Sequence, residues 1–163
     1  MRGLSLLLAL LITTCCEAKQ PPPPQLTSLQ VQAIQSKEFE TSKQIAFAST
    51  LSVLQDLGYT VESASMETGF ITAKSPTQTN SPANQFWTST VKNSETKVTA
   101  FIEQLKPTAT RVRLNFVNSE QLQRLGGAWG GAKQVKDTPV LDPLPYQNAF
   151  TKIEEAIFIR NGG

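Results

Sequence analysis

Two stretches of the chain carry apolar residues at the spacing of an amphipathic helix. The first starts after Thr41, which fits a capping box with Gln44 three residues later, and it stops before Gly58. The second starts after Asp142, a suitable N-cap residue that is followed by proline at the first helical position. We therefore predict two helices whose apolar stripes are Phe47, Ala48, Leu51, Leu54 and Leu57 in the first, and Tyr146, Phe150, Ile153 and Ile157 in the second.

Alternation of apolar and polar residues predicts five strands, near residues 29–39, 59–64, 70–74, 96–105 and 110–117. The last two form a hairpin, in which one face carries Val98, Ala100, Ile102, Val112, Leu114 and Phe116. The opposite face carries Arg111, Arg113 and Asn115, as expected for an antiparallel sheet with one solvated side. Residues 75–93 predict a surface loop, with one helical turn near residues 83–88, and residues 119–140 predict an irregular segment.

The order of these elements, β-α-β-β-β-β-α, predicts an α+β fold. Every pair of consecutive strands can be joined as a hairpin, so the sheet is expected to be antiparallel with four to five strands. The two amphipathic helices need an apolar surface, and one face of that sheet provides it. We therefore expect a single two-layer α+β domain over residues 29–163, with both helices packed on one face.

The first residues have the layout of an export signal. Arg2 gives a short positive region, an apolar run from Leu4 to Ile12 follows, and Cys15 and Cys16 stand where cleavage would fall. The apolar run is shorter than the roughly 20 residues that a bilayer-spanning helix needs. We predict a signal peptide over residues 1–14, then a lipid-anchor site and proline-rich linker over residues 15–28. Pro21 to Pro24 indicate either an extended spacer or a disordered leader.

The segment from Ile12 to Cys15 resembles the lipobox of bacterial lipoproteins, although Thr14 is bulkier than the residue usual there. The resemblance implies lipidation at Cys15, with Cys16 as the alternative, and palmitate as an expected fatty acid. A secreted or soluble periplasmic protein, cleaved after Ala18, remains an alternative, as does a retained anchor helix.

Composition narrows the possible chemistry. The chain has 15 Lys and Arg residues, 13 Asp and Glu residues and a formal net charge of +2, so its charge gives no reason to expect nucleic-acid binding. Histidine is absent, and the only cysteines are Cys15 and Cys16. The commonest general base, the commonest transition-metal ligand and a thiolate in the domain are therefore missing. We expect no catalytic residues, no metal and no cofactor.

A few residues remain as candidates for binding. Arg111 and Arg113 share a strand face and could bind an anionic glycan, a phosphate or a partner carboxylate, or could simply keep that face solvated. Trp129 lies among glycines from Gly126 to Gly131, and could contact a partner or pack back onto the domain. The adjacent Glu154 and Glu155 are about 100° apart on a helix and favour a solvated surface over a metal site.

Three segments resemble parts of small bacterial envelope lipoproteins. They run from Phe39 to Lys74, from Thr110 to Val117 and from Asp142 to Phe158, and their helix and hairpin are similar to the repeated domain of the outer-membrane assembly lipoprotein BamC. The resemblance implies an exported protein of the cell envelope, at the outer membrane and facing the periplasm, and it supplies no catalytic residues. The expected function is that of a membrane-tethered, non-enzymatic protein that contacts other envelope proteins; the alternative is a periplasmic binding module for an anionic small molecule, lipid or cell-wall glycan.

Overall fold

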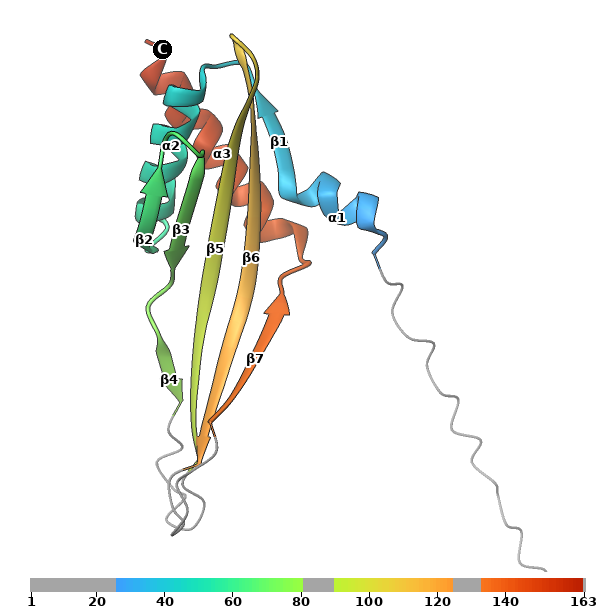
Figure 1. The fold of residues 1–163 in the computed structure, drawn as a ribbon, viewed down its shortest axis with the longest axis vertical. Coiled ribbons are helices and arrows are strands. Elements are labelled where there is room, and N and C mark those ends of the chain that lie inside the picture. Colours follow the sequence, from blue (N-terminus) through green and yellow to red (C-terminus); the bar gives the residue numbers. More distant parts are fainter. Residues whose placement is uncertain (1–25, 81–89, 125–132, 163) are drawn as a thin grey trace, which may run out of the picture.

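The computed structural model describes residues 26–80, 90–124 and 133–162 (Figure 1). These residues form an α+β fold with three helices and one antiparallel sheet of seven strands, which confirms the predicted fold class with more strands than expected. The helices are α1 (Ser28–Gln35), α2 (Lys43–Asp56) and α3 (Pro143–Arg160). The strands are β1 (Ser36–Phe39), β2 (Thr60–Ser65), β3 (Phe70–Lys74), β4 (Gln78–Asn80), β5 (Thr90–Lys106), β6 (Ala109–Arg124) and β7 (Lys133–Pro139).

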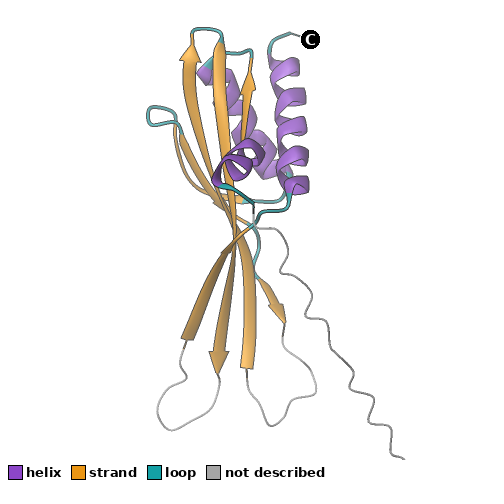
Figure 2. Cartoon of the chain, turned by 90° about the vertical axis from the view of Figure 1, so that its right-hand side faces the viewer, coloured by secondary structure: helices purple, strands orange, loops and turns teal. Residues whose placement is uncertain are grey.

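The sheet has two halves that share its two longest strands, β5 and β6. In one half the strand order is β1-β6-β5-β3-β2, and in the other half β4 pairs with β5 while β7 pairs with β6. Helices α2 and α3 cover one face of the first half, and the second half, formed by β4, β5, β6 and β7, extends beyond them as a ribbon (Figure 2). We call this second half the distal ribbon.

The core lies between the first half of the sheet and helices α2 and α3. Val98 lies directly opposite Phe116, Ala100 opposite Leu114 and Ile102 opposite Val112. All six side chains are buried, as the alternation predicts. The predicted stripe of α3 is also buried in full. Of the stripe predicted for the first helix, Phe47 and Leu54 are buried, whereas the others are half-buried, because the buried face of α2 is turned towards Ala46, Thr50 and Val53. The two-layer packing is confirmed.

The ends of α2 and α3 follow from local capping. The N-cap of α2 is Ser42, whose hydroxyl accepts a hydrogen bond from the Ile45 amide at 3.4 Å. The predicted N-cap, Thr41, is therefore wrong by one residue. The carbonyl of Thr41 accepts a hydrogen bond from the buried Thr110 hydroxyl. At the other end Gly58 has a φ of 84°, and the amides of Gly58 and Tyr59 bond back to Gln55 and Leu54, as in a Schellman motif. In α3, Asp142 caps the Leu144 amide at 3.0 Å, as predicted.

The strand predicted over residues 29–39 is wrong in its first part, which forms α1. The Thr27 hydroxyl accepts a hydrogen bond from the Gln30 amide, and the Gln30 side chain accepts one from the Thr27 amide at 2.8 Å. This capping box starts a helix, and glutamine has a good helix propensity, so local hydrogen bonding outweighs the apolar alternation. Leu29 accordingly stays exposed, and only β1 continues as a strand, paired with β6.

The distal ribbon is the second departure from the sequence analysis. Residues predicted to be loop or irregular include β4, the first residues of β5, the last residues of β6 and all of β7. Polar side chains occupy both faces there, so no apolar alternation marks these strands. Cross-strand pairs stabilise them instead, for example Lys92 with Glu120 at 3.0 Å and Thr96 with Asn118 at 2.9 Å.

Several predictions fall outside the described residues. The signal peptide, Cys15, Cys16 and most of the linker precede residue 26, and the helical turn near residues 83–88 and the glycine segment around Trp129 lie in the two gaps. Within the parts of the chain that the structure describes, no helix is both long enough and apolar enough to cross a membrane.

Candidate functional site

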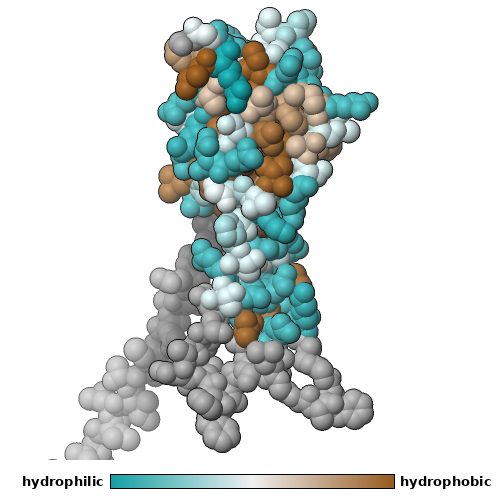
Figure 3. Space-filling view, turned by 90° about the vertical axis from the view of Figure 1, so that its left-hand side faces the viewer, coloured by the Kyte–Doolittle hydropathy of each residue, from teal (hydrophilic) through white to brown (hydrophobic). Residues whose placement is uncertain are grey.

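The face of the sheet that points away from α2 and α3 carries the candidate site. We call it the open face. Its side chains alternate with the buried ones along each strand, so the strand register arranges them in rows across the sheet. Seen from the side of β2, apolar residues gather over the half that holds the core, and the distal ribbon is mostly hydrophilic (Figure 3).

The central row of the open face combines two aromatic rings with one cation. Phe70 on β3 lies opposite Phe101 on β5, Phe101 lies opposite Arg113 on β6, and Arg113 lies opposite Ser36 on β1. The rings of Phe70 and Phe101 are tilted, with centroids 4.7 Å apart. Phe70 is 47% exposed, so this row leaves aromatic surface open to solvent beside a cation.

The next row is an ionic triad in which Arg111 lies between two carboxylates. Its guanidinium donates to Glu38 at 2.7 and 3.2 Å and lies 3.9 Å from Glu103. The hydrogen bond to the Glu38 carboxylate raises the pKa of Arg111 above its ordinary value. Arg111 is thus already engaged within the protein, and an incoming anion would have to compete with two carboxylates for it.

Arg113 has a different environment. Its guanidinium donates to the side-chain oxygen of Gln35 at 3.3 Å, and the Gln35 amide donates in turn to Asn115 at 3.3 Å. Gln35 is buried and is the last residue of α1, the helix that was not predicted from the sequence. This helix therefore holds the Arg113 side chain in position. Among the residues that the structure describes, Arg113 has no ion pair, and its positive charge is balanced by no carboxylate within 4 Å.

Two hollows meet at Phe101 and Arg113. One, of about 520 Å³, lies between α1 and the sheet and is lined on the helix side by Leu29 and Ala33. The other, of about 450 Å³, extends along the open face past Phe70, Thr99 and Asn115. Because Phe101 and Arg113 line both, the hollows form one trough, which we call the sheet-face groove.

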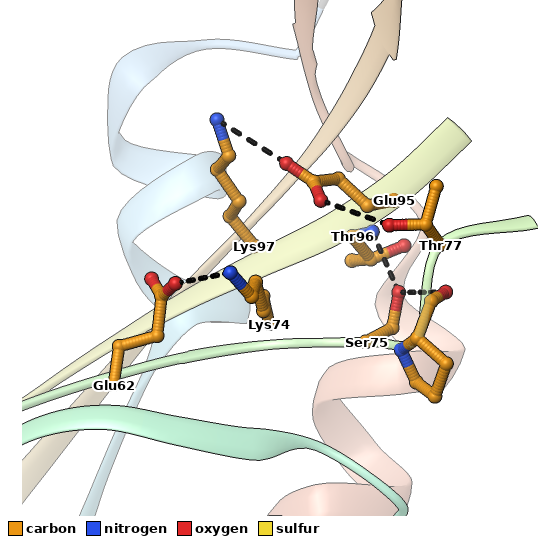
Figure 4. Close-up of polar contacts among 8 residues, drawn as sticks. Glu62, Lys74, Ser75, Thr77, Glu95, Thr96 and Lys97 are labelled. Carbon is orange, nitrogen blue, oxygen red and sulfur yellow. Dashed lines mark hydrogen bonds and ion pairs between the residues drawn. The ribbon is translucent and has the colours of Figure 1, made fainter. Parts of the chain in front are cut away.

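A second polar cluster, where β3 and β5 approach the distal ribbon, is satisfied internally (Figure 4). Lys74 pairs with Glu62 at 2.6 Å and Lys97 with Glu95 at 3.6 Å, and the Ser75 hydroxyl accepts a hydrogen bond from the Thr96 amide at 2.8 Å. The hydrogen bond to Glu62 raises the pKa of Lys74. These contacts link β3 to β2 and the residue after β3 to β5, and the Lys97–Glu95 pair lies within β5. No group of three or more metal-ligating side chains occurs in the described residues.

The residues that the sequence suggests as binding candidates differ in their surroundings in the structure. Arg111 and Arg113 do share the open face, but one is ion-paired and the other is not. Glu154 pairs with Lys37 at 2.8 Å, which fits a surface role. Phe70 and Phe101 are not among the candidates predicted from the sequence. Phe101 stands between the predicted core positions Ala100 and Ile102, so alternation alone would have placed its ring on the open face, and the pairing of β3 with β5 places Phe70 beside it.

No protein-family model matches this chain, and no curated protein matches it, so its function has to be argued from the sheet-face groove itself.

Proposed function

We propose that this protein is a non-enzymatic, membrane-tethered protein of the bacterial cell envelope that contacts other envelope proteins through the sheet-face groove. The observation that carries the proposal is the central row of the open face, where the exposed Phe70 and the half-buried Phe101 form an aromatic pair beside Arg113, which has no ion pair among the described residues. Aromatic residues and arginine are the types most enriched where protein interfaces derive their affinity.

The chemistry of the chain supports a binding role. Histidine is absent, and cysteine does not occur beyond Cys16, so nucleophiles such as Ser63 and Ser65 have no imidazole to activate them. The two arginines of the open face differ in what they can offer a partner: Arg111 is held by two carboxylates, whereas Arg113 is held only by a neutral amide and can accept a carboxylate from outside.

Photo-crosslinking in cells tests the contact surface. A photoreactive benzoylphenylalanine in place of Thr99, which lines the groove, is expected to form a reproducible adduct with one envelope protein. The matched control replaces Gln147, an exposed residue of α3, and is expected to form no such adduct. Adding Arg113→Ala to the Thr99 probe should reduce the adduct about tenfold, because a charge-assisted hydrogen bond of roughly 1.4 kcal/mol is removed. Equal adducts from both positions, or none from Thr99, would contradict the proposal.

Intact-mass measurement tests the proposed tether. The mature chain, extracted from membranes, is expected to begin at Cys15 and to carry fatty-acyl chains. Each buried acyl CH₂ contributes about 0.8 kcal/mol, so a multiply acylated cysteine would keep the protein on the membrane. An unmodified chain that begins at Lys19 and is recovered in the soluble fraction would show that the protein is secreted without an anchor.

A further inference from the structure

We propose that the sheet-face groove binds an extended peptide segment of a partner protein, in which one acidic residue stands close to an aromatic or aliphatic residue. This inference rests on the proposed function, because it names the kind of partner that the groove would contact. Three properties of the groove carry it: its charge balance, its apolar surface and its open shape.

The charges around the groove favour a ligand that carries one negative charge. Glu38 and Glu103 flank Arg111, so that row carries a net charge of −1, and Arg113 adds +1 in the adjacent row. A single carboxylate can form a charge-assisted pair with Arg113, whose only hydrogen bond to a described side chain is the one it donates to the neutral amide of Gln35. A polyanion would bring further negative charge towards Glu38 and Glu103, and like charges repel. The groove therefore suits a monoanion.

The apolar surface lies directly beside this cation. Phe101 is the cross-strand neighbour of Arg113, and Phe70 extends the aromatic surface by one more strand. On the helix side Leu29, 74% exposed, and Ala33 line the same trough. Adjacent strands are about 4.8 Å apart and an extended chain rises about 3.3 Å per residue, so a ligand would present its carboxylate and its apolar group within about three residues of each other.

The shape of the groove favours a peptide over a small molecule. A small-molecule site encloses most of its ligand, whereas here two open hollows continue on both sides of Phe101 and Arg113. A segment that crosses this point would fill both. The next row of the open face, formed by Thr72, Thr99 and Asn115, offers hydrogen-bonding groups to the amides and carbonyls of such a segment.

Fluorescence polarisation with defined peptides tests the inference on the full-length protein in detergent. The probes are ten-residue peptides with capped ends, in which one Asp and one Phe, one to four positions apart, stand in a Gly/Ser/Thr background. We expect binding at one or two of these separations. Replacing Asp by Asn, or Phe by Ser, in the bound peptide is expected to weaken binding at least tenfold.

Two protein variants locate the bound peptide. Arg113→Gln should weaken binding at least tenfold, and Lys97→Gln should leave it unchanged, because Lys97 lies on the open face but is paired with Glu95 away from the groove. Thermal melts of both variants confirm that they are folded. Peptide binding that is equally strong in Arg113→Gln would overturn the inference.

The same experiment separates this inference from the proposed function. If no peptide binds while the crosslink through Thr99 persists, the inferred peptide ligand is wrong, but the sheet-face groove is still the contact surface. If dodecanoate, a small monoanionic amphiphile, binds in an Arg113-dependent way and no peptide does, the groove takes a small ligand and the inference is overturned. If no peptide binds and no crosslink forms through Thr99, both the inference and the proposed function are wrong.

Discussion

Replacing Gly69 by alanine is expected to lower the free energy of unfolding by about 3 kcal/mol or more. Gly69 has a φ of 78°, and a Cβ at this position would overlap the backbone carbonyl of Ile102. The Ile102 amide donates a hydrogen bond to the Gly69 carbonyl at 2.8 Å. The backbone at Gly69 therefore cannot move away from β5 to make room for the Cβ without losing that hydrogen bond. The left-handed conformation costs a non-glycine residue about 1–3 kcal/mol, and the overlap adds a packing cost of about the same size.

Gly58→Ala is the matched control for this substitution. Gly58 also has a positive φ, 84°, but a Cβ there would meet no atom within 4 Å, so we expect a loss of only about 1 kcal/mol. Urea titration of both variants measures the difference. Equal losses would show that the close approach of Gly69 to Ile102 does not constrain the fold.

Removing the hydroxyl of Tyr146 is expected to destabilise the protein by about 2 kcal/mol. β1 pairs with β6 as far as Arg113, and β7 pairs with β6 from Val117 onwards, which leaves the edge of β6 open between them. The Tyr146 hydroxyl fills this opening: it accepts a hydrogen bond from the Phe116 amide at 3.3 Å and donates one to the Val140 carbonyl at 2.9 Å. Tyr146→Phe keeps the ring contact with Phe116 but leaves a buried amide without a partner, which costs about 1–3 kcal/mol.

Tyr59→Phe provides the comparison for Tyr146→Phe. Tyr59 also packs against Phe116, with ring centroids 6.1 Å apart, and partial burial raises the pKa of its phenol. Its hydroxyl makes no hydrogen bond with the described residues that would be lost, so we expect a change within about 0.5 kcal/mol in thermal or urea unfolding. If both variants lost the same stability, the bridging role of the Tyr146 hydroxyl would be wrong.

The parts of the fold that the sequence predicts are those where apolar spacing and a buried surface coincide. The stripe of α3 and the alternation from Val98 to Ile102 both face the same core, and both were predicted correctly. β4 and β7 are mostly polar and β7 is exposed along its whole length, so they carry no such pattern, and their pairing depends on the strands beside them. In α1 the capping box of Thr27 and Gln30 outweighs a misleading alternation.

The candidate site could be predicted only in part. Strand alternation is enough to place Arg111 and Arg113 on one face. The difference between them depends on Glu38 and Gln35, which are 73 and 78 residues away in the sequence. Such a difference is set by the pairing of β1 with β6 and by the position of α1, and neither is visible in the local sequence.

The length of β5 and β6 has a mechanical consequence. Each strand runs without interruption from the distal ribbon into the first half of the sheet, where the same two strands carry Phe101 and Arg113 (Figure 1). A torque applied to the far end of the ribbon therefore has a covalent path to the groove, along two backbones joined by one continuous ladder.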